Sequence, residues 1–138
     1  MKSEKARVLV VEDDNLFLWT LIHFLEKEGY EVVSAVSGEK AYEMALKGFF
    51  DIVISDFHLP GLNGKELIRR VKSIQPTTKT VLITAYQPEE TGKEETALNA
   101  YLNKPIELGN LRKVLQERSA RPFYRGGCSP AEGRFGGD

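Results

Sequence analysis

Short apolar runs recur along this 138-residue chain, and four of them end at polar residues whose side chains could do chemistry. These side chains are carboxylates, one hydroxyl and one amine, a set that suits a hard metal ion and a phosphoryl group. They belong to Glu12, Asp13 and Asp14 after the first run, Asp56 after the third, Thr84 at the end of the fourth and Lys104 after the fifth. If the runs are parallel strands, their carboxyl ends share one edge of a sheet, and these side chains meet there.

The acids at these ends would repel one another if they converged without a counter-charge. At ~4 Å and an effective dielectric of ~20, each pair of like charges costs roughly 4 kcal/mol. Such a cluster resolves when a carboxyl group takes up a proton or when a hard cation binds. Mg²⁺ suits this cluster because it accepts a few carboxylates, keeps several waters and bridges to phosphate oxygens. The sequence therefore predicts a magnesium site rather than a pocket for phosphate alone.

The other residues fit further roles in phosphoryl transfer. Asp56 stands alone after its run and before a turn, which favours it as the nucleophile. Lys104 can add positive charge beside the metal, and the Thr84 hydroxyl can donate a hydrogen bond. Each residue alone also has an ordinary explanation as a turn, cap or surface residue. All of them in this order, each at the end of a run, are hard to obtain by chance.

The apolar runs are continuous and β-branched, which is typical of strands covered on both faces of a parallel sheet. Helical patterns separate them, and an Asn-Gly-Lys-Glu capping sequence marks the start of the third helix. The predicted strands are 7–11, 31–36, 51–55, 80–84 and 100–102, and the predicted helices are 15–28, 38–47, 64–74, 88–98 and 107–118. Five strand–helix units in this length predict an α/β fold with an open, doubly wound sheet.

The first predicted helix is apolar almost all round. A buried stripe along it would consist of Phe17, Leu21, Phe24 and Leu25. Leu16 and Trp19 point away from this stripe. We weigh two explanations for Trp19: a neighbouring helix or the tail covers it, or a partner protein binds there.

The chain fits a single domain over residues 6–118. Residues 119–138 hold five glycines and two prolines without apolar periodicity, so we predict a flexible tail or linker there. A net charge of −1 argues against direct binding to nucleic acid or to an anionic membrane. The single Cys128 excludes an intramolecular disulfide, and the N-terminal apolar run is too short for a secretory signal or a membrane span. We therefore expect a cytoplasmic protein.

Four motifs together resemble the receiver domains of two-component response regulators. They are residues 8–14 (VLVVEDD), 56–64 (DFHLPGLNG), 82–85 (LITA) and 101–105 (YLNKP). As a set they are highly specific, and the resemblance extends over about residues 6–118. It implies a flavodoxin-like fold, with a five-stranded parallel sheet in the order 2-1-3-4-5 and helices on both faces.

The resemblance also implies roles at the metal site. Glu12 and Asp13 would hold Mg²⁺, whereas Asp14 would start a helix. Asp56 would be the phosphoacceptor and a metal ligand. The backbone carbonyl of His58 would be a further ligand.

The resemblance further implies a switch and a partner. Thr84 and Tyr101 would be the switch pair, and Lys104 would contact the phosphate just before a cis bond to Pro105. The phosphoryl donor would be a histidine kinase or a histidine phosphotransfer protein. The chain could form a homodimer on phosphorylation, and it would turn over no separate substrate as an enzyme does.

Two rival functions remain to be weighed. Enzymes of other classes lose support because the chain lacks a G-x-x-x-x-G-K-[ST] loop, a G-x-G-x-x-G after a strand, and a D-x-D nucleophile after its first strand. The alternative is a receiver-like interaction module that works without phosphorylation. The segment between Thr84 and Lys104 is about two residues shorter than the family pattern, which mildly favours that alternative. The intact set of site residues argues against it.

Overall fold

The computed structural model describes residues 5–85 and 100–116 and the backbone of residues 123–125. Strands and helices alternate over most of this part of the chain. The elements are β1 (Arg7–Val11), α1 (Asn15–Lys27), β2 (Glu31–Ala35), α2 (Gly38–Lys47), β3 (Ile52–Asp56), α3 (Gly64–Ile74), β4 (Lys79–Thr84), β5 (Ala100–Asn103), α5 (Leu108–Gln116) and β6 (Phe123–Arg125).

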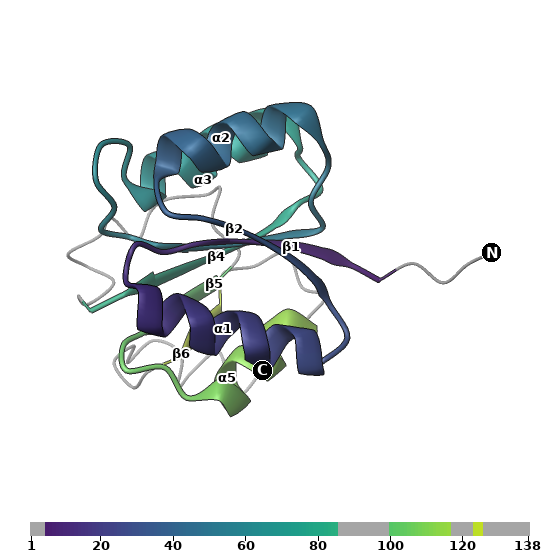
Figure 1. Cartoon of the computed structure of the whole chain (residues 1–138), viewed down its shortest axis with the longest axis vertical. Coiled ribbons are helices and arrows are strands. Elements are labelled where there is room, and N and C mark those ends of the chain that lie inside the picture. Colours follow the sequence, from purple (N-terminus) through teal and green to yellow (C-terminus); the bar gives the residue numbers. More distant parts are fainter. Residues whose placement is uncertain (1–4, 86–99, 117–122, 126–138) are drawn as a thin grey trace.

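The strands form one parallel sheet in the order β2-β1-β3-β4-β5-β6. The helices α2 and α3 cover one face of this sheet, and α1 and α5 cover the other (Figure 1). Alternate residues of β1 accordingly enter two cores. Val8 and Val10 pack with α1 and α5, whereas Leu9 and Val11 pack with α2 and α3. Burial on both faces is the reason that the strands are continuously apolar.

The predicted strand order 2-1-3-4-5 is confirmed, and so is the presence of helices on both faces. Strand and helix bounds agree with the prediction to within two residues wherever the structure describes them. The helix predicted over 88–98 lies outside the described residues.

A sixth strand was not predicted. β6 pairs in parallel with β5, with Tyr124 opposite Tyr101, so the described part of the chain forms a six-stranded sheet rather than a five-stranded one. The strand is only three residues long, too short to produce a recognisable apolar pattern. It falls within the predicted tail of residues 119–138, and the rest of that tail lies outside the described residues.

Side-chain caps fix where the helices beside the strand ends begin. Asp14 Oδ1 accepts hydrogen bonds from the backbone N–H groups of Leu16 (3.1 Å) and Phe17 (3.4 Å), so Asp14 starts α1 as expected. Asn63 Oδ1 accepts from the Glu66 N–H at 2.9 Å and starts α3 as predicted. These caps set the first turn of α1 shortly after the end of β1, and that of α3 after the loop 57–63 that follows β3.

No helix in the described residues combines the length and the apolar character that a transmembrane span requires.

Candidate metal centre

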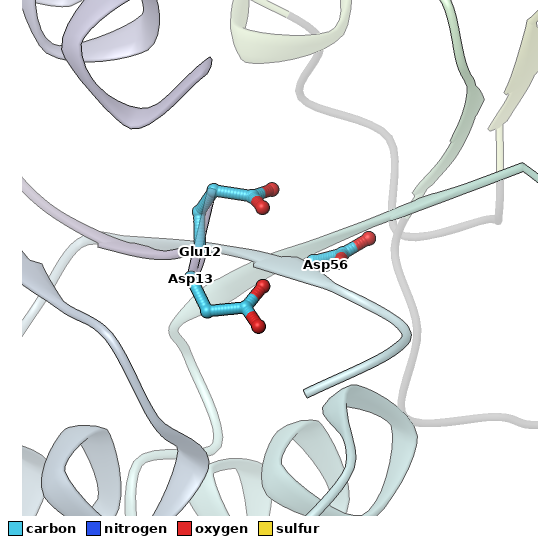
Figure 2. A group of neighbouring side chains, drawn as sticks. All are labelled: Glu12, Asp13 and Asp56. Atoms are coloured by element: carbon cyan, nitrogen blue, oxygen red, sulfur yellow. The ribbon is translucent and has the colours of Figure 1, made fainter. Parts of the chain in front are cut away.

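Three carboxylates converge at the carboxyl edge of the sheet. Glu12 and Asp13 follow β1, and Asp56 is the last residue of β3. One oxygen from each lies within 4.8 Å of the others. Figure 2 shows Glu12 and Asp13 directed toward the side on which Asp56 lies. The pairing of β1 with β3 explains this arrangement, since Val11 stands opposite Ser55 and the next residue of each strand is an acid.

Two of these acids are buried and one is exposed. Glu12 is 1% exposed and Asp56 is 7% exposed, whereas Asp13 lies at the surface. Among the described residues, Glu12 Oε1 accepts no hydrogen bond, while Glu12 Oε2 accepts one from the Asp14 N–H at 3.0 Å. A buried carboxylate oxygen without a donor is costly, so the centre favours an additional positive charge. Because Asp13 is exposed, one side of the centre is open to solvent.

Burial controls the ionisation of both inner acids. It raises the pKa of Glu12 above its ordinary value; the Asp14 N–H lowers that pKa, and the charge of Asp56 raises it. Burial likewise raises the pKa of Asp56 above its ordinary value. The ammonium of Lys104 lowers this pKa, and the negative charge of Asp13 raises it. Desolvation and mutual repulsion therefore disfavour ionisation of all three acids when no cation is bound. A hard metal ion would relieve this repulsion, so the cluster favours its binding.

Lys104 supplies a positive charge from the protein itself. Its Nζ lies 3.3 Å from Asp56 Oδ1 and 3.6 Å from Glu12 Oε1. The backbone at this residue is tied to β4, because the Lys104 N–H donates to the Thr84 carbonyl at 2.9 Å. The Lys104–Pro105 bond is cis, as expected. A single ammonium facing two carboxylates leaves the centre with a surplus of negative charge.

Thr84 and Tyr101 lie on neighbouring strands. Thr84 is the last residue of β4 and is fully buried. It stands opposite Asn103, two residues after Tyr101, so Thr84 and Tyr101 project from the same face of the sheet. The Tyr101 ring is 1% exposed and belongs to a small cluster with Ile68 and Leu82. The ring therefore lies inside the protein in this structure.

The loop between β3 and α3 packs closely on the end of β3. The Phe57 carbonyl accepts a 2.9 Å hydrogen bond from the Gly64 N–H. A Cβ atom on Gly64 would overlap the carbonyl oxygen of Asp56, so the helix start can approach the strand only because this residue is glycine. His58 lies in this loop with its ring edge-on to Phe57, 5.0 Å between centroids. The role of its carbonyl as a ligand stays a prediction.

The family model for the response regulator receiver domain matches residues 8–116, which include all four sequence motifs. The chain belongs to this receiver family. Its likeness to solved receivers extends to the whole fold. A CheY-like receiver domain protein of Methanospirillum hungatei is 28% identical, with a TM-score of 0.78 over 83% of this chain and 94% of that one. The chemotaxis response regulator CheY4 of Vibrio cholerae is 32% identical, with a TM-score of 0.72 over 80% and 99%.

Curated relatives of this receiver domain are longer proteins. The uncharacterized transcriptional regulatory protein YkoG of Bacillus subtilis is 34% identical over 86% of this chain and 54% of its own length. A cyclic di-GMP phosphodiesterase of Thermotoga maritima is 33% identical over 85% of this chain and 32% of its own length. The chain thus spans about half of the first of these relatives and about a third of the second.

Within the receiver domain, the structure brings together the acids and the lysine that the sequence singled out. One contact at the site was not predicted: the Lys104 Nζ lies 4.9 Å from the centre of the Phe17 ring. The sequence placed Phe17 in the buried stripe of the first helix, and it is partly buried against the core on that side. Its position three residues after Asp14 was the available signal, because that spacing puts it in the first helical turn beside the strand end.

Proposed function

We propose that Asp56 of this receiver domain accepts a phosphoryl group from a histidine kinase or a histidine phosphotransfer protein, with Mg²⁺ bound beside it. The observation that carries the proposal is the placement of Asp56 between a pair of acids and the ammonium of Lys104, 3.3 Å from its Oδ1. An ordinary structural ion pair needs no further carboxylates. A phosphoryl transfer site needs both a metal and a fixed cation.

The donor set fits Mg²⁺. It offers carboxylate oxygens from Glu12, Asp13 and Asp56 within 4.8 Å of one another, one of them buried without a hydrogen-bond donor. We assign these three residues, together with the backbone carbonyl of His58, as the protein ligands. Mg²⁺ takes oxygen ligands in this number and keeps waters in its remaining positions. When bound, it neutralises the acids and provides positive charge for the oxygens of the incoming phosphoryl group.

In the proposed transfer, an Asp56 carboxylate oxygen attacks phosphorus in line with the phosphohistidine nitrogen. The O–P bond forms as the N–P bond breaks, and the electron pair stays on the imidazole of the donor. Lys104 then pairs with a phosphoryl oxygen instead of with Asp56 Oδ1. Hydrolysis of the acyl phosphate later restores the aspartate, so the chain changes state without turning over a separate substrate.

The proposed response passes through Thr84 and Tyr101. The phosphoryl oxygens offer strong acceptors to the Thr84 hydroxyl, which would draw the end of β4 toward Asp56. Because Tyr101 projects from the same face on the next strand, this movement favours the inward position of its ring. Phosphorylation then shifts a population that already contains the buried ring of this structure.

We place this receiver in a cytoplasmic phosphorelay, since its donors would be phosphorylated histidine proteins. The output partner is a protein or a further domain, and phosphorylation could also drive formation of a homodimer. This assignment includes no direct contact with nucleic acid or membrane.

The test is intact mass measured before and after incubation with Mg²⁺ and acetyl phosphate. We expect one phosphate adduct that requires Mg²⁺ and is absent from Asp56→Asn. An adduct that persists in Asp56→Asn would move the acceptor elsewhere. Binding of partners with no adduct under any condition would support the phosphorylation-independent interaction module instead.

A further inference from the structure

The ammonium of Lys104 touches an aromatic ring as well as the two acids. Its Nζ lies 4.9 Å from the centre of the Phe17 ring, within the distance of ~6 Å at which a cation is attracted to a ring face. The Lys104 side chain is 30% exposed, so solvent reaches it from one side. Phe17 lies in the first turn of α1, on a different element from both of the buried acids.

The contacts of Phe17 and Lys104 complete a closed cycle of interactions around the site. Glu12 Oε2 accepts from the Asp14 N–H at 3.0 Å, and Asp14 Oδ1 accepts from the Phe17 N–H at 3.4 Å. The Phe17 side chain then meets Lys104, whose Nζ returns to Glu12 Oε1 at 3.6 Å. The position of the Phe17 aromatic ring therefore depends on Glu12 through the cap of α1, and not on packing against the core alone.

We propose that Phe17 is a positioning residue for Lys104, one that keeps the ammonium beside Asp56 when the acids are occupied by metal. The relevance to phosphoryl transfer rests on the proposed function, but the contact itself does not. Without metal, the two carboxylates suffice to hold the ammonium. A divalent cation competes for those same oxygens and also repels Lys104. The ring face attracts the ammonium yet is no ligand for a hard cation, so this contact persists when the ion pairs weaken.

Phe17 also packs against the core on the α1 side, so a loss of function on truncation would not separate positioning from packing. Fluorination does separate them. Successive fluorine atoms on the ring withdraw charge from its face and weaken cation attraction, while its size and apolar character change little. The protein offers a matched control on the same helix, because Phe24 lies under Arg112 with 5.5 Å between the guanidinium carbon and the ring centre.

The first measurement reads the contact without any reaction. In the metal-free protein and with Mg²⁺, the Phe17 ring current should shift the NMR signals of the Lys104 ε-methylene protons upfield. Phe17→Leu should return these signals to the position of an exposed lysine, and Phe17→Tyr should restore the shift. Signals that are unshifted in the parent protein, or unchanged in Phe17→Leu, would overturn the proposal.

The second measurement is the rate of Mg²⁺-dependent phosphorylation by acetyl phosphate. With 4-fluoro-, 3,5-difluoro- and 3,4,5-trifluorophenylalanine at position 17, we expect stepwise slowing that reaches roughly fivefold, the scale of a partly desolvated cation–π contact. The same series at position 24 should leave the rate unchanged. In a Lys104→Ala background, the dependence on fluorine at position 17 should disappear.

The outcomes also separate this inference from the proposed function. A parent protein that takes up no phosphate contradicts the function, and the NMR shift still tests the contact. If the parent takes up phosphate, two results contradict positioning by Phe17. One is a phosphorylation rate that does not change with fluorination at position 17, and the other is a rate that falls equally with fluorination at positions 17 and 24.

Discussion

Glu39 of α2 accepts a 2.9 Å hydrogen bond through its Oε2 from the backbone N–H of Leu62, in the loop that leaves Asp56. Gly61, next to Leu62, has φ +72°, and a Cβ atom there would overlap the Glu39 carboxylate. A helix on one face of the sheet thus holds the loop that carries His58. The geometry of the proposed metal centre would therefore depend on a residue that contributes no ligand to it.

Glu39→Ala should weaken Mg²⁺ binding several-fold, because the loop loses its acceptor and His58 is held less firmly. The loss of one such hydrogen bond should also lower stability by about 1 kcal/mol. Glu39→Gln keeps an acceptor oxygen, so its affinity for Mg²⁺ should be close to that of the parent. The control is Glu43→Ala, because Glu43 is an exposed acid on the same helix. Titration calorimetry with Mg²⁺ measures the effect. Equal affinities for Glu39→Ala and Glu43→Ala would disprove the role of this bond.

Asp56→Asn should raise the melting temperature of the metal-free protein by a few degrees at neutral pH. Burial raises the pKa of Asp56 in the folded state, so the folded protein holds this proton more tightly than the unfolded chain does. Ionisation therefore costs stability as pH rises past the unfolded pKa, and the asparagine variant avoids that cost. As the pH falls below the unfolded pKa, where the carboxyl is protonated in both the folded and the unfolded state, the difference should shrink. A gain that grows as pH falls would have the wrong sign.

Mg²⁺ should stabilise the parent protein against heat, because binding to the folded state alone adds RT ln(1 + [Mg²⁺]/Kd). The rise in melting temperature should be reversed by EDTA and should be much smaller in Asp13→Asn, which loses the exposed carboxylate of the three. Asp51, an acid at the opposite end of β3, serves as the control through Asp51→Asn. Equal Mg²⁺ responses in the two variants would remove Asp13 from the ligand set.

Thr84→Ala should take up phosphate on Asp56 nearly as the parent does but should lose the response of the Tyr101 ring. The reason is that the Thr84 hydroxyl is the proposed link between the phosphoryl group and β5. NMR of the Tyr101 ring protons, with and without beryllofluoride as a phosphoryl mimic, measures the coupling. Thr80→Ala removes another buried threonine from the same strand and should keep the response. A full response in Thr84→Ala would show that the coupling runs elsewhere.

Trp19→Ala should slow transfer from a phosphohistidine protein but not from acetyl phosphate. Trp19 is 57% exposed on α1 and lies apart from the buried stripe. The His23 ring lies against it, tilted by 34° with 3.9 Å between centroids. An exposed aromatic of this size is typical of a protein contact. Stopped-flow transfer with both donors makes the comparison. Equal slowing with both would indicate that Trp19 supports the fold instead of the encounter.

The sequence was sufficient to predict that Glu12 and Asp56 lie at the ends of neighbouring strands, because each directly follows a continuous apolar run. The order of a doubly wound sheet makes β1 and β3 neighbours, and Glu12 and Asp56 meet because the register then sets Val11 opposite Ser55. Local capping patterns likewise predicted Asp14 and Asn63 as helix starts.

The sequence patterns did not predict contacts that depend on the direction of individual side chains. Phe17 has the spacing of a core residue, and nothing in that spacing reveals a lysine 87 positions later over its ring. Glu39 is an ordinary acid in the first turn of a helix, and its loop contact arises only from how α2 and α3 pack. β6 was missed because pairing along an edge is a property of the partner strand as much as of its own three residues.

The pairing of β6 with β5 also bears on how other chains can approach. An edge strand exposes unpaired N–H and C=O groups that invite a foreign strand, and β5 would be such an edge without Phe123–Arg125. A peptide that binds by extending the sheet beside Tyr101 must first displace this short strand, and each residue pair it gains replaces one that the protein already had. Within the described residues, strand addition without such an exchange is left to the two outer margins of the sheet, along β2 and along the three-residue β6.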